Sequence, residues 1–273
     1  MTTTSTTPAP TRAVRPPSAA TALADLGRLI TRALRHEART LDALLVNIAL
    51  PVLIMIVFVY VFGGAITTGS SGLDYIDFVV PTVLLMAGGY GAALSAVNIS
   101  EELTGGMIDR FRTLPISGWT VPASHVVASL VRNVAATAIA LAVAVALGFR
   151  PDATIAEWAL VLALVSGYIL AVSSIAMVWG LLVTSSQAAG AFSFAVIFFP
   201  YLSDGVVPAE TMPPLLRGFA EYQPTTPIVE TLRALLLDQP MGDAGRLSAV
   251  WLAAAVVISL PLAALLFRRR TST

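Results

Sequence analysis

Few side chains in this 273-residue chain could do covalent chemistry, and the missing residue types narrow the possible activities. There is no cysteine, so disulfides and thiolate catalysis are excluded. The two histidines, His36 and His125, lie far apart in the sequence, which argues against a metal site. All sixteen basic residues are arginine, so the chain cannot form a Walker A loop, whose lysine binds nucleotide phosphates, or a Schiff base.

Residues 101–117 (EELTGGMIDRFRTLPIS) have the most unusual composition in the chain. The charged residues are Glu101, Glu102, Asp109, Arg110 and Arg112, and the apolar ones include Ile108, Phe111 and Leu114. The three apolar residues are spaced for one helical face, Gly105 and Gly106 interrupt the preceding segment, and Pro115 ends the helix. Such a helix suits docking into a partner's groove, and a solvated loop between two helices would explain the composition equally well.

A third group consists of polar side chains within long apolar stretches: Asn47, Ser95, Asn98, His125, Arg132 and Asn133. A charge inside a bilayer is costly and usually faces a cavity or a partner. Arg132 could therefore lie at the mouth of a substrate path, or it could extend its long side chain to the membrane surface. Three nearby glycines, Gly88, Gly89 and Gly91, favour close helix packing, and a gate is the alternative.

Aromatic residues are concentrated in two of the same stretches, around Phe58 to Phe62 and around Phe192 to Tyr201. Phe194 and Phe198 belong to the second group. They could line an apolar path for an amphipathic ligand, together with the polar residues above. Contacts with lipid or with other helices are the more usual role of such residues.

The composition requires these residues to be positioned by membrane-spanning helices. Hydrophobic residues make up 56% of the chain and charged residues only 12%, about half the usual share in soluble domains, with a mean hydropathy of +0.82. A spanning helix needs roughly 20 mostly apolar residues. We expect an all-α, polytopic integral membrane protein with six such helices, at 41–63, 78–99, 123–147, 155–183, 188–202 and 247–267.

The arginines predict the orientation of this six-helix domain, residues 41–267. Eleven lie before the first span, between the second and third spans, or after the sixth, at positions 12, 15, 28, 32, 35, 39, 110, 112, 268, 269 and 270. Four lie on the opposite side, at positions 150, 217, 233 and 246. By the positive-inside rule both termini are cytoplasmic, as an even number of spans requires. The zero net charge gives no indication of nucleic-acid binding.

Four further segments flank or interrupt the spans. Residues 1–20, rich in Thr, Pro, Ala and Ser, are expected to form a disordered cytoplasmic tail, and 268–273 a second tail. Residues 21–40 alternate leucines with arginines at helical spacing and predict an amphipathic helix on the membrane surface. The proline-rich residues 203–246 are expected to form short helices on the external face, one of them over 228–237.

The run GGMIDRFRTLPIS, which follows Glu101 and Glu102, resembles the cytoplasmic loop of type-2 ABC exporter permeases, most closely the daunorubicin/doxorubicin-resistance branch. The six spans, the amphipathic helix and the string QPTTPIVETLRALL at 223–236 are similar to that family as well. The resemblance extends over residues 21–270. The pair Gly105–Gly106 before Met107 departs from the wider family, which often has threonine after the loop glycine, and fits the drug-resistance branch.

This resemblance implies a transport subunit without its own ATPase site, in the plasma membrane of a bacterium, that exports a hydrophobic or amphipathic compound. It would pair with a second permease, identical or related, and with two separate ATPase subunits, which would bind ATP and magnesium. Residues 101–117 would form the coupling helix that contacts the ATPase. Ile108, Phe111 and Leu114 would anchor the helix, Asp109, Arg110 and Arg112 would make charged contacts, and Glu101 and Glu102 would supply the family's acidic residue.

Two other classes of membrane protein are compatible with the hydropathy but less so with the polar residues. A secondary transporter driven by an ion gradient usually has acidic residues or broken helices at mid-membrane, whereas the acidic residues here lie at the ends of the spans. An intramembrane enzyme needs a nucleophile with a base, or a metal, within the spans. With no cysteine and only His125 beside a span, the sequence offers neither arrangement.

Overall fold

The computed structural model describes residues 41–64, 73–105 and 120–272. The expected tail at 1–20, the amphipathic helix at 21–40 and most of the expected coupling helix, residues 106–117, lie outside these ranges. Within them the chain is helical, with no strand. The all-α expectation is therefore confirmed for the part of the chain that the structure describes.

The helices follow the predicted spans closely. The first half of the chain forms α2 (Leu41–Val57), which continues as the short π-helix η1 (Phe58–Phe62), then α3 (Tyr75–Ala93), α4 (Ser95–Thr104) and α6 (Thr120–Ala146). The second half forms α7 (Ile155–Leu182), α8 (Ser186–Tyr201), η3 (Ala209–Thr211), α9 (Pro214–Tyr222), α10 (Thr225–Leu236) and α11 (Ala244–Ser272).

Local sequence signals explain several helix ends. The Thr154 hydroxyl accepts a hydrogen bond from the Glu157 amide, and the Glu157 carboxylate accepts one from the Thr154 amide, which forms a capping box at the start of α7. At the start of α8, the Ser185 hydroxyl accepts a single capping hydrogen bond from the Ala188 amide. Gly148 adopts a φ of +119° just after α6, a conformation that favours glycine.

Four helices are long and apolar enough to cross a membrane, by length and composition: Tyr75–Leu103, Ala123–Ala146, Ile155–Leu182 and Ala244–Arg270. The first of these comprises α3 and α4, which meet at a one-residue break at Leu94. The apolar helix Ile48–Phe62 and the sixteen-residue α8 fall short of the length of a full span. The count of six spans therefore stays a prediction, whereas the multi-pass membrane character is clear.

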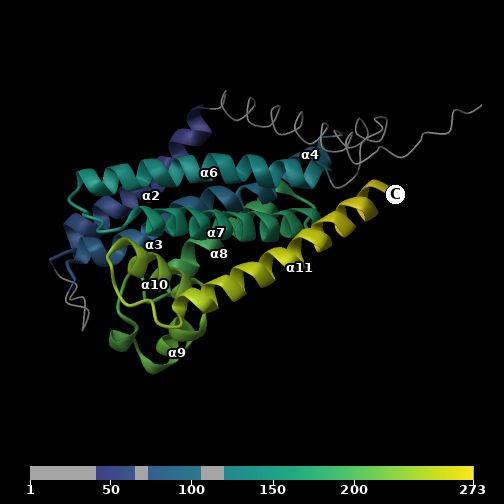
Figure 1. Ribbon diagram of the computed structural model, residues 1–273. Coiled ribbons are helices and arrows are strands. Elements are labelled where there is room, and N and C mark those ends of the chain that lie inside the picture. Colours follow the sequence, from purple (N-terminus) through teal and green to yellow (C-terminus); the bar gives the residue numbers. More distant parts are fainter. Residues whose placement is uncertain (1–40, 65–72, 106–119, 273) are drawn as a thin grey trace, which may run out of the picture.

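The described helices form an elongated bundle with two distinct ends (Figure 1). At one end, here called the α4 end, the last turn of α4 lies beside the first turns of α6 and the final turns of α7 and α11, as one buried cluster of Ile99, Val126, Met177 and Phe267 shows. At the other end, here called the α10 end, α10 lies beside the beginnings of α3 and α11. There the backbone amide of Asp152, just before α7, donates to the Leu236 carbonyl.

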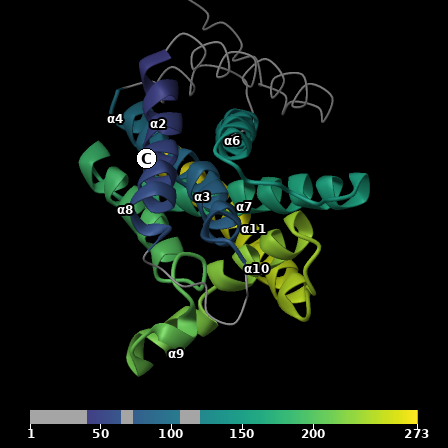
Figure 2. The ribbon, with the colours of Figure 1, turned by 90° about the vertical axis from the view of Figure 1, so that its left-hand side faces the viewer.

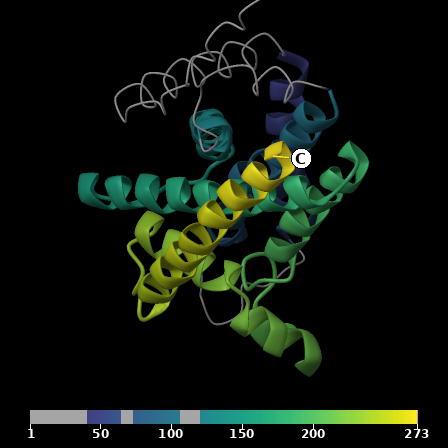
Figure 3. The same ribbon diagram turned by 90° about the vertical axis from the view of Figure 1, so that its right-hand side faces the viewer.

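The order of packing places α3 at the centre of the bundle. Nearly all of α3 is buried, against α2, α6, α7 and α8, whereas most of α11 is exposed and crosses α7 diagonally (Figure 3). Figure 2 shows α6 end-on above α3 and α7, and α9 standing apart from the other helices. A protein with this distribution carries its apolar surface outward, as a bilayer requires.

Glycine in α3 is explained by close packing, as the sequence indicated. A methyl group added at Gly89 would lie 2.8 Å from the Tyr168 hydroxyl, and one added at Gly88 would lie 3.1 Å from the Thr137 hydroxyl. Gly180 in α7 packs directly against the backbone carbonyl of Ala96 in α4. These contacts bring α6 and α7 close to α3 and α4. The close packing sets the positions of the polar side chains between these helices.

Candidate functional site

The expected coupling segment begins at the α4 end, where the structure describes Glu101, Glu102 and Gly105. Both glutamates lie in the last turn of α4, and Gly105 follows that helix with its amide donating to the Glu101 carbonyl. The remaining members of the predicted set lie outside the described residues: Ile108, Asp109, Arg110, Phe111, Arg112, Leu114 and Pro115. Their role in coupling stays a prediction.

Glu102 makes a contact that the sequence did not indicate. Its Oε2 atom lies 2.9 Å from Nε2 of His125, in the second turn of α6. Both side chains are largely buried. The sequence placed His125 at the membrane boundary but offered no partner for it, because the two residues are 23 positions apart and meet only through the packing of α4 against α6.

The polar residues proposed for a substrate path lie in three helices. Ser95 is buried and Asn98 is partly buried in α4. For Asn47 the structure describes only the backbone, which is helical and belongs to α2. Arg132 lies well inside α6 and donates a hydrogen bond of 3.1 Å to the Gly91 carbonyl of α3, close to the break at Leu94. The structure thus brings Arg132 to the region of α3 and α4 that also carries Ser95.

Other buried polar groups on α6 are satisfied within the bundle. Asn133 donates to the Ser129 carbonyl at 2.7 Å, Thr137 donates to the Asn133 carbonyl at 2.8 Å, and the hydroxyls of Ser129 and Ser173 lie 2.8 Å apart. The first two of these bonds lie within α6, and the contact of Ser129 with Ser173 joins α6 to α7. They account for these side chains through helix packing without a ligand.

The two aromatic groups meet at the α10 end. The ring of Phe58, in the π-helix η1, lies 5.8 Å from that of Tyr201 in α8 and 5.5 Å from that of Phe62. Phe198 lies 6.3 Å from Tyr201. Phe194 and Phe198 are 68% and 59% exposed, so they form part of the outer surface of this chain. An aromatic surface facing outward is compatible with lipid, with a second subunit or with an amphipathic ligand.

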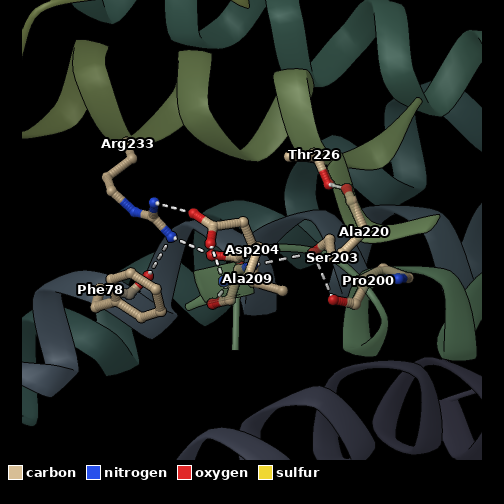
Figure 4. A network of polar contacts seen from close by, with 10 residues as sticks. Phe78, Pro200, Ser203, Asp204, Ala209, Ala220, Thr226 and Arg233 are labelled. Atoms are coloured by element: carbon tan, nitrogen blue, oxygen red, sulfur yellow. Dashed lines mark hydrogen bonds and ion pairs between the residues drawn. The ribbon is translucent and has the colours of Figure 1, made fainter. Parts of the chain in front are cut away.

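A network of polar contacts at the α10 end centres on Arg233 (Figure 4). The guanidinium lies over the Phe78 ring at 4.0 Å, donates to the Phe78 carbonyl at 3.3 Å and to the Asp204 carbonyl at 3.1 Å, and pairs with the Asp204 carboxylate at 3.5 Å. Arg233 therefore joins α10, α3 and the turn after α8 in one contact set.

That turn, residues 203–206, is held from several sides. The Ser203 hydroxyl donates to the Pro200 carbonyl at 2.6 Å, and the Asp204 carboxylate accepts from the Ala209 amide at 2.6 Å. From α3, the Thr82 hydroxyl donates to the Gly205 carbonyl at 2.8 Å and the Tyr75 hydroxyl to the Val206 carbonyl at 3.3 Å. The turn is therefore fixed to α3 through its backbone.

Burial and neighbouring charges set the electrostatics of this network. Burial lowers the pKa of Arg233, and the carboxylates of Asp204 and Glu230 oppose that shift. Desolvation raises the pKa of the Glu230 carboxyl, with the Asp204 charge adding to the rise and Arg233 opposing it. The charge of Arg233 therefore acts on both carboxylates, and its ion pair is with Asp204.

The sequence predicted Arg233 to lie on the external face but gave no partner for it. The available signal was an arginine within an apolar helical string, since such a residue needs an acidic partner when it is buried. Among the described residues there is no group of three or more His, Cys, Asp or Glu side chains that could hold a metal ion.

Comparison with known proteins supports the family expected from residues 101–117. The family model of the ABC-2 type transporter matches residues 25–237. The chain is 25% identical over 192 residues to the daunorubicin resistance ABC transporter permease protein DrrB1 of Streptomyces coeruleorubidus, an alignment that covers 69% of this chain and 66% of the relative. It is 28% identical over 256 residues to the probable doxorubicin resistance ABC transporter permease protein DrrC of Mycobacterium tuberculosis, with 92% and 89% covered. The chain therefore belongs to the ABC-2 type transporter family.

Proposed function

We propose that this chain is the membrane-spanning permease subunit of an ATP-driven exporter, powered by separate ATPase subunits. The observation that carries the proposal is the family match over residues 25–237, which includes the segment 101–117 and both helices that flank it. The absence of lysine agrees with it, since the chain has no Walker A loop of its own. ATP and magnesium would bind to the partner ATPase.

The arrangement of helix ends supports the proposed orientation. The last turn of α4 and the first turns of α6, which flank the segment 106–119, share the α4 end with the final turns of α11. Arg268, Arg269 and Arg270 lie in those final turns, and Arg270 donates to the Leu182 carbonyl at the end of α7. A cytoplasmic α4 end therefore gathers the arginine-rich segments on the side that the positive-inside rule requires.

In this orientation the ATPase would contact residues 101–117 on the cytoplasmic side. Ile108, Phe111 and Leu114 would fill an apolar groove, and Asp109, Arg110 and Arg112 would contact its rim. Glu101 and Glu102 would connect this segment to α4. Movement of the ATPase subunits during ATP hydrolysis would then be passed to the spans that begin and end there.

The compound carried would be hydrophobic or amphipathic. The names of both relatives refer to resistance to an anthracycline drug, which supports a substrate of that chemical character. A path would be formed between this chain and a second permease, with Phe194 and Phe198 on its exposed aromatic surface and Ser95, Asn98 and Arg132 nearer the centre of the bundle. The second permease would be an identical copy or a related chain.

Inside-out membrane vesicles test this function directly. Vesicles that contain the chain together with its ATPase subunits are expected to accumulate doxorubicin when ATP is added, and the purified chain alone is expected to hydrolyse no ATP. Vesicles with a proton gradient and no ATP serve as the comparison. Accumulation that follows the proton gradient and ignores ATP would contradict the proposal and favour a secondary transporter.

A further inference from the structure

The contact between Glu102 and His125 joins the two helix ends that flank the segment 106–119. Oε2 of Glu102 lies 2.9 Å from Nε2 of His125, and the two side chains are 21% and 15% exposed. Glu102 lies in the last turn of α4 and His125 in the second turn of α6. The pair therefore connects the chain just before that segment to the chain just after it.

The position of Glu102 is not explained by the stability of its own helix. The C-terminal end of a helix carries a partial negative charge, which disfavours a carboxylate in the last turn. Two carboxylates, Glu101 and Glu102, nevertheless lie in the last turn of α4, which has no basic residue there. A partner in another helix offsets this cost, and His125 provides one from α6.

The pair also lies on an apolar cluster that reaches four helices. Val126, next to His125, packs with Ile99 of α4, with Met177 and Leu181 of α7, and with Phe267 of α11. Gly180 brings the backbone of α7 against α4 at Ala96 in the same region. A displacement of Glu102 and His125 would consequently be passed to α7 and α11 as well, because a close-packed cluster moves as a unit.

We propose that Glu102 and His125 form a positioning pair, which holds the ends of α4 and α6 together so that force on the segment 106–119 moves both helices at once. This inference rests on the proposed function, in which that segment contacts the ATPase. Without the pair, the ATPase would still bind but would move α4 and α6 independently. The loss would therefore affect the turnover of the complex and leave its assembly intact.

The test uses the full chain in complex with its ATPase subunits in proteoliposomes. The variants are Glu102→Ala, His125→Ala, the double variant, and the exchanged pair Glu102→His/His125→Glu. Glu221→Ala is the matched control, because Glu221 forms a carboxylate ion pair with Arg217 on α9, 2.7 Å long and exposed to solvent. For each complex, kcat and KM for ATP are measured, together with the amount of ATPase retained on the tagged permease.

Each single variant is expected to lower kcat by about tenfold, with KM and ATPase retention unchanged. The double variant is expected to lower kcat no further than a single variant does. The exchanged pair is expected to recover most of the loss. The inference would be overturned if the two single losses in kcat multiplied in the double variant. It would also be overturned if the single variants kept a kcat within about twofold of the unaltered complex, or if they lost the retained ATPase.

The absence of cysteine allows the contact itself to be checked. Glu102→Cys/His125→Cys in the otherwise cysteine-free chain is expected to cross-link on mild oxidation in membranes, whereas Glu221→Cys/His125→Cys is not. Failure of the first pair to cross-link would contradict the geometry. An unaltered chain that retains no ATPase would instead overturn the proposed function, and this inference with it.

Discussion

Each end of the bundle carries a contact between two polar side chains, similar in burial but different in construction. At the α10 end the side chains of Arg233 and Asp204 are 11% and 24% exposed, and at the α4 end those of His125 and Glu102 are 15% and 21% exposed. Burial therefore does not distinguish them. Arg233 also contacts two backbone carbonyls and the ring of Phe78, which keep their positions whatever the charge of a carboxylate.

This difference in the contacting groups suggests that the two ends have different functions. A guanidinium held by backbone carbonyls and a ring fixes three segments in one geometry. A carboxylate–imidazole contact depends on two side chains that can separate and meet again as their helices move. We therefore expect changes at the α10 end to lower the stability of the fold and changes at the α4 end to lower the coupling to ATP hydrolysis.

The largest effect on stability is expected for Arg233→Ala. The change leaves the carboxylate of Asp204 without its cation and should cost about 2–3 kcal/mol, less than for a fully buried pair because Asp204 is partly exposed. In detergent micelles the apparent Tm, followed by tryptophan fluorescence, should fall by about 5–10 °C. Arg233→Lys keeps the charge, so its apparent Tm should lie between those of the unaltered chain and Arg233→Ala.

The control for this comparison is Arg246→Ala, which removes an arginine from an ion pair with Asp243 that is exposed to solvent. Its apparent Tm should match that of the unaltered chain, because exposed pairs contribute little. Equal losses for Arg233→Ala and Arg246→Ala would show that the buried network has no special part in holding the α10 end.

Close packing, and not a polar network, is expected to be the main source of rigidity near the α4 end. Gly180→Ala would push a methyl group against the backbone carbonyl of Ala96 and should cost about 1–3 kcal/mol, since neither backbone can yield without moving its helix. Gly218→Ala on α9 has open space around it and should be neutral or slightly stabilising. If the two alanine variants melted at the same temperature, the close approach of α7 to α4 would be wrong.

Glu102→Ala is expected to have a smaller effect on stability than either change above. The loss should stay below about 1 kcal/mol, or about 3 °C in the apparent Tm, because the contact is partly exposed and α4 no longer carries that carboxylate at its negative end. The same unfolding assay checks this value. A fall as large as that of Arg233→Ala would mean that both ends are primarily structural.

The smallest expected effect is a stabilisation by Glu230→Gln. The pKa of the Glu230 carboxyl is raised in the folded chain, so its charged form is disfavoured there and costs stability near neutral pH. This cost disappears as the pH falls through the raised pKa toward the ordinary carboxyl value. Glu230→Gln should therefore raise the apparent Tm slightly at neutral pH, because Glu230 is exposed and water screens most of the effect, and should leave it unchanged in acid. An advantage that grows in acid would contradict the assigned shift.

The sequence predicted the helices well because their signals are local. Apolar runs of sufficient length predicted the ranges of α6, α7 and α8 to within a few residues. The break at Leu94 escaped prediction, since no proline marks it and it lies inside a continuous apolar run. Such a break depends on how α3 and α4 pack against their neighbours.

The candidate site was predicted only in its local part. The composition of residues 101–117 and the acidic pair Glu101–Glu102 were visible in the sequence, whereas the partner of Glu102 was not. His125 meets the carboxylate of Glu102 in α4, 23 residues away, and Arg233 meets that of Asp204 in the turn after α8, 29 residues away. Pairings of this kind follow from tertiary packing, which a single sequence does not reveal.

Binding of a separate ATPase at residues 101–117 can be tested by measuring how much ATPase stays on the purified permease. Phe111→Asp/Leu114→Asp is compared with Leu215→Asp/Phe219→Asp, a matched pair of changes at exposed apolar residues of α9. We expect the tagged permease, still folded in the membrane, to lose the ATPase with the first pair and to keep it with the second. Retention by both variants, or loss from the α9 variant alone, would show that the ATPase does not bind at residues 101–117.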